Sequence, residues 1–270
     1  MANNYNSPYE ATSTQTSASW TFSQSQSKLM TRSFLYTGIS FVAIFLLSLG
    51  IYSLLLRVSD DISAAQTANV FLAISPILVL VSSLMGIFIR PRSSGGMAFI
   101  AITYTLYIIA QSIGLGGLFF AIEFTDKING QPSNLIDIVS IFGVAGLMFI
   151  GMAIVGSTLS RKAGVKFSRF LMAAFFAYML SSLIFSISFI FIRGGAFDWL
   201  IIASTLIGGL LNMGYIVFIV FQMKQSSDFV DLAGNAHFTN TLSLYYGFWM
   251  LVSLMGLVWQ LLRLYLFFKR

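Results

Sequence analysis

The first apolar segment of the chain reads FLYTGISFVAIFLLSLGIYSLLL (residues 34–56) and contains no charged side chain. A helix rises about 1.5 Å per residue, so about 20 apolar residues cross a bilayer core about 30 Å thick. Six similar runs follow, and the predicted spans are residues 34–56, 68–89, 97–122, 135–159, 167–192, 197–223 and 242–268. The sequence therefore predicts an all-α integral membrane protein, a bundle of seven transmembrane helices.

The composition excludes several classes of protein. Hydrophobic residues make up 57% of the chain and charged residues only 9%, against about 25% charged in soluble domains. The net charge of +6 comes from Lys and Arg in short loops beside the spans. This placement indicates membrane topology and no nucleic-acid partner; the lipid bilayer is the expected surrounding. The absence of cysteine excludes disulfides, thiolate metal sites and cysteine nucleophiles.

The N-terminal segment differs from the rest. Residues 1–30 are rich in Ser, Thr, Asn and Gln and predict a disordered polar tail, whereas residues 31–270 form the transmembrane domain. Lys and Arg are more frequent in alternate loops, which predicts a cytoplasmic N-terminus in a cell membrane. Seven spans then place Arg263, Lys269 and Arg270 outside, against the same rule. A shallow or re-entrant last segment is the alternative.

Signs of enzyme chemistry are almost absent. The single histidine, His237, falls in the predicted loop before the last span. A zinc site of the HExxH type needs two histidines, and a serine nucleophile in the membrane needs its base at the same depth. We therefore expect no enzyme activity and no cofactor. Glu123 and Asp126 are expected in a solvated outer loop, and Asp137 at the interface, with a cation entrance as its alternative.

A few polar and small residues lie inside the spans. Amides in a span usually form hydrogen bonds between helices, so Gln111 and Asn212 are expected to hold helices together. Arg263 is expected to extend toward the interface or to pair with a carboxylate. Glycines in spans three and four predict close helix packing, with flexibility as the alternative: Gly114, Gly116, Gly117, Gly143, Gly146, Gly151 and Gly156. Pro76 predicts a kink in the second span.

Four stretches together resemble the Bax inhibitor-1 family of seven-helix membrane proteins. They are RPRSSGGMAF (residues 90–99), SIGLGGL (residues 112–118), the segment 142–162, and LSLYYGF (residues 242–248) followed by LLRL (residues 261–264). The resemblance covers roughly residues 30–270 and implies a Bax-inhibitor-like bundle. In the glycine motif Gly117 stands where the family usually has proline, and Gln111 where an acidic residue often precedes the motif.

The resemblance also implies a function, with one important departure. Bacterial members of the family are pH-sensitive calcium leak proteins, closed by an aspartate pair on the sixth and seventh spans. Aligning this chain with those motifs puts Ile219 and Gly247 at the two aspartate positions. Without these carboxylates the proton switch and the oxygen ligands that calcium requires are both missing, so a calcium site is not carried over.

Three functions remain open from the sequence. The first is a non-enzymatic Bax-inhibitor-like protein with a binding or regulatory role in membrane stress response or ion homeostasis. The second is a cation leak channel or transporter without carboxylates, with Gln111, Asn212 and the glycine-rich third span along its pathway. The third is a subunit that packs against other membrane proteins through an aromatic face: Tyr245, Tyr246, Phe248 and Trp249.

Overall fold

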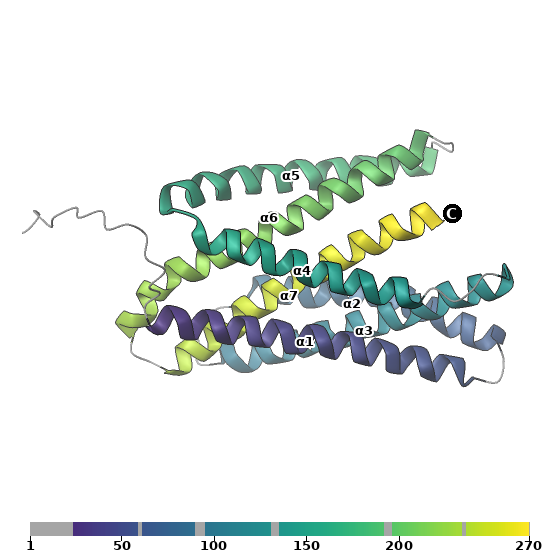
Figure 1. Cartoon of the computed structure of the whole chain (residues 1–270), viewed down its shortest axis with the longest axis horizontal. Helices are drawn as coiled ribbons and strands as arrows, with labels where there is room; N and C mark the ends of the chain where they lie inside the picture. The colour runs from purple at the N-terminus through teal and green to yellow at the C-terminus, as the bar shows by residue number, and fades with distance from the viewer. Residues whose placement is uncertain are drawn as a thin grey trace, which may run out of the picture.

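Long helices make up the part of the chain that the computed structural model describes (Figure 1). They are α1 (Gln24–Leu56), α2 (Asp61–Ile87), α3 (Gly96–Ile128), α4 (Leu135–Thr158), α5 (Arg161–Phe191), α6 (Ala196–Ala233) and α7 (Ala236–Lys269). The backbone is described for residues 24–58, 61–89, 95–130, 135–191, 196–233 and 236–269, and side chains for these except residues 24–26, 61, 135, 179–198, 200 and 227–236. The predicted all-helical fold is confirmed for these residues.

Six helices are long and apolar enough to cross a membrane over their described residues. They are Ser27–Leu56, Ile62–Ile87, Gly96–Ile128, Ile136–Thr158, Ile201–Ser226 and His237–Lys269. Helix α5 is 31 residues long, and its side chains beyond Tyr178 lie outside the described residues, so the fifth span stays a prediction. The chain is a multi-pass helical membrane protein in contact with the lipid bilayer.

Helix α7 is the centre of the bundle. It packs against α1, α3, α4 and α6, and apolar side chains are buried on most of its circumference, as expected for a helix enclosed by others. Fully buried examples are Met250, Leu251, Met255, Val258 and Leu262. The last segment is therefore a full-length helix inside the bundle.

Hydroxyl groups join α1 to α7. Ser33 Oγ donates to the carbonyl of Ser243 at 3.0 Å, and Thr37 Oγ1 donates to that of Gly247 at 3.1 Å. One turn earlier, Leu29 is fully buried. Helix α1 begins at Gln24, so residues 24–30, predicted as part of the disordered tail, are helical; residues 1–23 lie outside the described part of the chain.

The glycines of α3 allow close packing, as predicted. A Cβ on Gly116 would lie 2.7 Å from the side chain of Ile51 in α1, and one on Gly117 would lie 3.0 Å from the carbonyl oxygen of Ala68 in α2. A Cβ on Gly114 would lie still closer to its neighbour, the side chain of Ser75 in α2. This part of α3 thus serves helix packing against α1 and α2.

The prediction for α4 was mostly wrong. Only Gly156 meets a neighbour, where a Cβ would lie 2.6 Å from the carbonyl oxygen of Val217 in α6. The other three, Gly143, Gly146 and Gly151, have no atom within 4 Å of a built Cβ. Phenylalanine rings separate α4 from α1 instead: Phe142 packs on Phe41 and Phe45, with centroids 5.4 and 4.9 Å apart.

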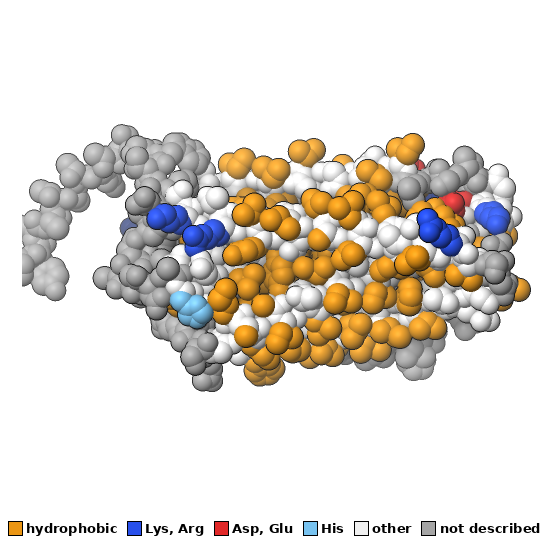
Figure 2. Space-filling view, turned by 90° about the horizontal axis from the view of Figure 1, so that it is seen from below, with side chains coloured by type: hydrophobic (Ala, Val, Ile, Leu, Met, Phe, Trp, Pro, Cys, Tyr) orange, Lys and Arg blue, Asp and Glu red, His pale blue; other side chains and the backbone are white. Residues whose placement is uncertain are grey.

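The bundle has two distinct ends. The basic end, where α1, α3, α5 and α7 begin, carries the cations Lys28, Arg32, Arg161, Lys162, Lys166, Arg169 and Lys224. The opposite or far end carries Asp126, Asp137 and Lys269. On the face seen in Figure 2, charged side chains gather at the two ends and an apolar belt lies between them. Such a belt is typical of the hydrocarbon zone of a membrane protein.

Candidate functional site

Gln111 occupies a fully paired polar position in the middle of the bundle. Its Oε1 accepts a hydrogen bond from Trp259 Nε1 of α7 at 2.8 Å, and its Nε2 donates to the Tyr107 hydroxyl at 2.9 Å. The side chain is 2% exposed. Gln111 therefore links α3 to α7, and the prediction of an interhelical hydrogen bond is confirmed.

Asn212 behaves differently from the prediction. Its Nδ2 donates to the carbonyl oxygen of Gly208 in its own helix at 2.9 Å. Its Oδ1 faces α7 at Gly256, where a Cβ would lie 2.6 Å away. Asn212 thus packs against α7 at Gly256, and its Nδ2 hydrogen bond to Gly208 stays within α6.

The two positions aligned with the family's aspartates are both buried. Ile219 is 2% exposed within the apolar core. A Cβ on Gly247 would lie 3.1 Å from Tyr36 Cβ and 3.2 Å from the Ser33 carbonyl oxygen. A side chain at position 247 would therefore press against α1.

The far end contains an ion pair where a solvated loop was predicted. Asp126 lies inside α3 and is 3% exposed, and Lys269 Nζ donates to its two carboxylate oxygens at 2.5 and 2.6 Å. Nearby, exposed Asp137 of α4 accepts a hydrogen bond from the Tyr265 hydroxyl at 3.1 Å. Arg263 lies on the exposed surface of α7. Part of the expected outer loop is therefore the last turn of α3, and Lys269 of α7 pairs with it.

Two alternatives from the sequence, a cation entrance at Asp137 and an aromatic packing face, gain no support from these contacts. In the described part of the chain, no three His, Cys, Asp or Glu side chains gather in a way that holds a metal ion. His237 is exposed in the first turn of α7. The four rings suggested as a packing face lie inward: Tyr246 and Phe248 are buried, and Tyr245 and Trp249 are half-buried.

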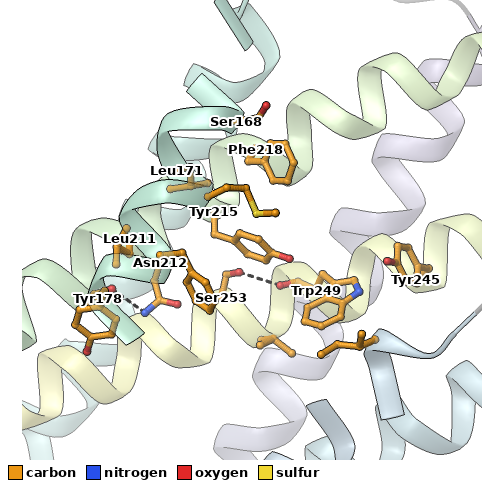
Figure 3. A pocket seen from close by; sticks show the side chains of 15 residues that line it. Ser168, Leu171, Tyr178, Leu211, Asn212, Tyr215, Phe218, Tyr245, Trp249 and Ser253 are labelled. Atoms are coloured by element: carbon orange, nitrogen blue, oxygen red, sulfur yellow. Dashed lines mark hydrogen bonds between the residues drawn. The ribbon is translucent and has the colours of Figure 1, made fainter. Parts of the chain in front are cut away.

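The described residues line a pocket of about 440 Å³ between α5, α6 and α7 (Figure 3). That volume lies within the range of about 300–1,000 Å³ found for small-molecule sites. The pocket is lined by Ile87, Ser168, Leu171, Met172, Phe175, Tyr178, Gly208, Leu211, Asn212, Tyr215, Phe218, Tyr245, Trp249, Val252 and Ser253. Ile87 ends α2 and Ser168 lies early in α5, whereas Ser253 lies at the middle of α7, so the pocket extends from the middle of the bundle toward the basic end.

The position of α5 creates the pocket. Helix α5 packs mainly on α6 and stands at the edge of the bundle (Figure 1). Its lining residues Ser168, Leu171, Met172 and Phe175 follow helical spacing and form one face. Met172, Phe175 and Ile87 are also exposed on the apolar surface, so the mouth of the pocket faces the bilayer hydrocarbon.

Aromatic and polar groups shape the inner wall. Tyr215 projects from α6 across the pocket toward Ser253 and Trp249 of α7 (Figure 3). The rings of Tyr215 and Trp249 meet edge to face with centroids 6.3 Å apart. Ser253 Oγ donates to the Trp249 carbonyl at 3.0 Å. The pocket is therefore apolar with a few hydroxyl and amide groups, a composition typical of ligand sites.

Among the site residues predicted from the sequence, the structure places only Asn212 in the pocket. Gln111 belongs to the α3–α7 contact, Asp137 and Arg263 to the α4 and α7 surfaces, and the α3 glycines to helix packing. Tyr245 and Trp249 were named only as part of an aromatic packing face, and the other lining residues were missed because an apolar stripe on a membrane helix has the same sequence pattern whether it faces lipid or a pocket.

Comparisons with protein-family models, with curated proteins and with solved structures found no match to this chain.

Proposed function

We propose that the chain is a non-enzymatic membrane protein of the Bax inhibitor-1 type that binds an apolar chain from the bilayer in the pocket between α5, α6 and α7. The role is binding or regulatory, in membrane stress response or ion homeostasis. The single observation that carries the proposal is the 440 Å³ apolar pocket whose rim residues Ile87, Met172 and Phe175 are exposed. The proposed orientation places the basic end of the bundle in the cytoplasm, in agreement with the positive-inside rule.

The filled bundle centre supports binding rather than conduction. Around α7 most core residues are apolar, the buried polar ones are mainly Ser and Thr, and Asp126 is the one charged side chain among the buried residues that the structure describes. That carboxylate is paired with Lys269 at the far end. A cation moving through the bundle would lose its hydration shell and meet mainly apolar side chains, with no carboxylate besides the paired Asp126 among the described buried residues, which is costly.

Photo-crosslinking tests the pocket. The protein is reconstituted with phosphatidylcholine that carries a diazirine in its acyl chain, and crosslinked peptides are mapped by mass spectrometry. We expect a crosslink at Tyr215, which lines the interior of the pocket, together with crosslinks at lipid-facing Ile150.

A matched pair of variants completes the test. Val252→Trp fills the pocket and is expected to abolish the Tyr215 crosslink while keeping the one at Ile150. Val144→Trp makes the same change on the lipid-facing surface of α4 and is expected to leave both unchanged. Absence of a Tyr215 crosslink in the unmodified protein, or equal yields in the two variants, would contradict the proposal.

A further inference from the structure

The pocket lies directly beside a cluster of basic side chains. Helix α5 supplies five of the lining residues, from Ser168 to Tyr178, and begins at Arg161. Arg161, Lys162, Lys166 and Arg169 are all exposed. An apolar cavity and a cationic surface therefore share one helix.

The helical positions bring two of these cations close to the mouth. Arg161 lies on the same face of α5 as Ser168, two turns or about 10 Å nearer the basic end. Arg169 follows Ser168 directly in the sequence. Arginine side chains are long and can follow an apolar surface while keeping the guanidinium at the membrane–water interface. Both guanidinium groups can thus reach the interface above the pocket.

The start of α5 adds to the positive potential. Ser160 Oγ accepts a hydrogen bond from the Ala163 backbone N–H at 3.3 Å, which caps the helix. The N-terminus of a helix carries about half a positive charge because its first N–H groups lack helical partners. This end of α5 consequently favours an anionic group more than the basic side chains alone would.

A pocket open to lipid needs such a polar contact to select its ligand. An acyl chain that leaves the bilayer for an apolar pocket exchanges one apolar surrounding for another, so burial alone gives little net gain. Packing in the pocket and interactions of the headgroup must then provide the preference. The nearby cations supply the second contribution for a negatively charged headgroup.

We infer that the pocket binds an anionic phospholipid of the leaflet at the basic end, with one acyl chain between α5, α6 and α7 and the phosphate at Arg161 and Arg169. This inference rests on the proposed binding function of the same pocket. It adds the ligand class and the two residues that recognise its headgroup.

The test compares two diazirine lipids that differ only in the headgroup, phosphatidylglycerol and phosphatidylcholine, each in phosphatidylcholine vesicles containing the full-length protein. We expect a higher crosslink yield at Tyr215 with phosphatidylglycerol. Each basic side chain near an anionic lipid contributes a factor of about 5 to binding, so Arg161→Gln/Arg169→Gln is expected to weaken the apparent affinity for phosphatidylglycerol about 25-fold. The affinity for phosphatidylcholine should stay the same.

The control removes the same number of charges elsewhere. Lys28 in α1 and Arg57 after α1 are exposed, and neither lines the pocket. Lys28→Gln/Arg57→Gln is expected to keep the preference for phosphatidylglycerol. Equal Tyr215 yields with the two lipids, or an unchanged preference in Arg161→Gln/Arg169→Gln, would overturn the assignment of an anionic ligand and leave the pocket as an apolar site. Failure of both lipids to crosslink at Tyr215 would overturn the proposed function itself.

Discussion

Lys269 in the last turn of α7 and Asp126 near the end of α3 form an ion pair with Nζ–O distances of 2.5 and 2.6 Å. The exposed fractions of the two side chains are 19% and 4%. At the other end of α7, Asn240 accepts a hydrogen bond from Arg32 of α1. Helix α7 therefore extends from one end of the bundle to the other, which argues against a re-entrant last segment. The pairing also explains how Lys269 is accommodated at the end opposite the basic cluster.

Lys269→Met is expected to destabilise the protein by about 3 kcal/mol, because it removes the ammonium group from a buried carboxylate. Thermal unfolding in detergent measures the effect. The double variant Lys269→Met/Asp126→Leu should regain most of the loss, since an apolar pair replaces an ion pair at little cost. An unfolding temperature unchanged by Lys269→Met would show that the pair does not hold α7 to α3.

Gln111→Leu is expected to cost about 1–2 kcal/mol, because Trp259 Nε1 loses its acceptor and the Tyr107 hydroxyl loses its donor. The double variant Gln111→Leu/Trp259→Phe should cost less than the sum of the two single changes. Chemical unfolding of all three variants gives the coupling energy. Strictly additive costs would mean that the hydrogen bond contributes nothing.

Gly116→Ala and Gly143→Ala form a matched pair. The first places a methyl group 2.7 Å from the side chain of Ile51, and overpacking of this kind costs about 1–3 kcal/mol. The second meets no atom within 4 Å and replaces glycine by the best helix former, a gain of up to about 1 kcal/mol. The unfolding temperature should therefore fall for Gly116→Ala and stay level or rise for Gly143→Ala; the reverse order would contradict the α1–α3 packing.

The absence of cysteine makes the topology directly measurable. Single cysteines that replace Arg57 and Ile128 report the side of the membrane on which the far end lies. Those that replace Lys28 and His237 report the side of the basic end. In intact cells a membrane-impermeant maleimide should label Arg57→Cys and Ile128→Cys, whereas Lys28→Cys and His237→Cys should react only after permeabilisation. Labelling of His237→Cys from outside would reverse the proposed orientation.

Length and hydropathy were sufficient to predict the helices, because a bilayer-spanning run is a local property of the sequence. The helix ends were less predictable. Helix α3 continues to Ile128 although Asp126 is charged, and the reason is Lys269, 143 positions further along the chain. No local pattern contains that partner.

The pocket shows the same limit. Ser168, Met172 and Phe175 share a helix face that the sequence reveals, yet Tyr215 and Trp249 complete the wall from two other helices. The glycines of α4 illustrate the opposite error: spacing suggested close packing, but Gly143, Gly146 and Gly151 meet open space. Small residues permit a close approach without requiring one.

The central claim, a binding protein whose bundle is closed to ions, is tested most directly by calcium and potassium flux from proteoliposomes at pH 6 and pH 8. The account predicts flux equal to that of protein-free vesicles at both pH values, because the described core is mostly apolar and its buried carboxylate is paired. Cation flux above that of the protein-free vesicles would contradict it and favour a leak pathway.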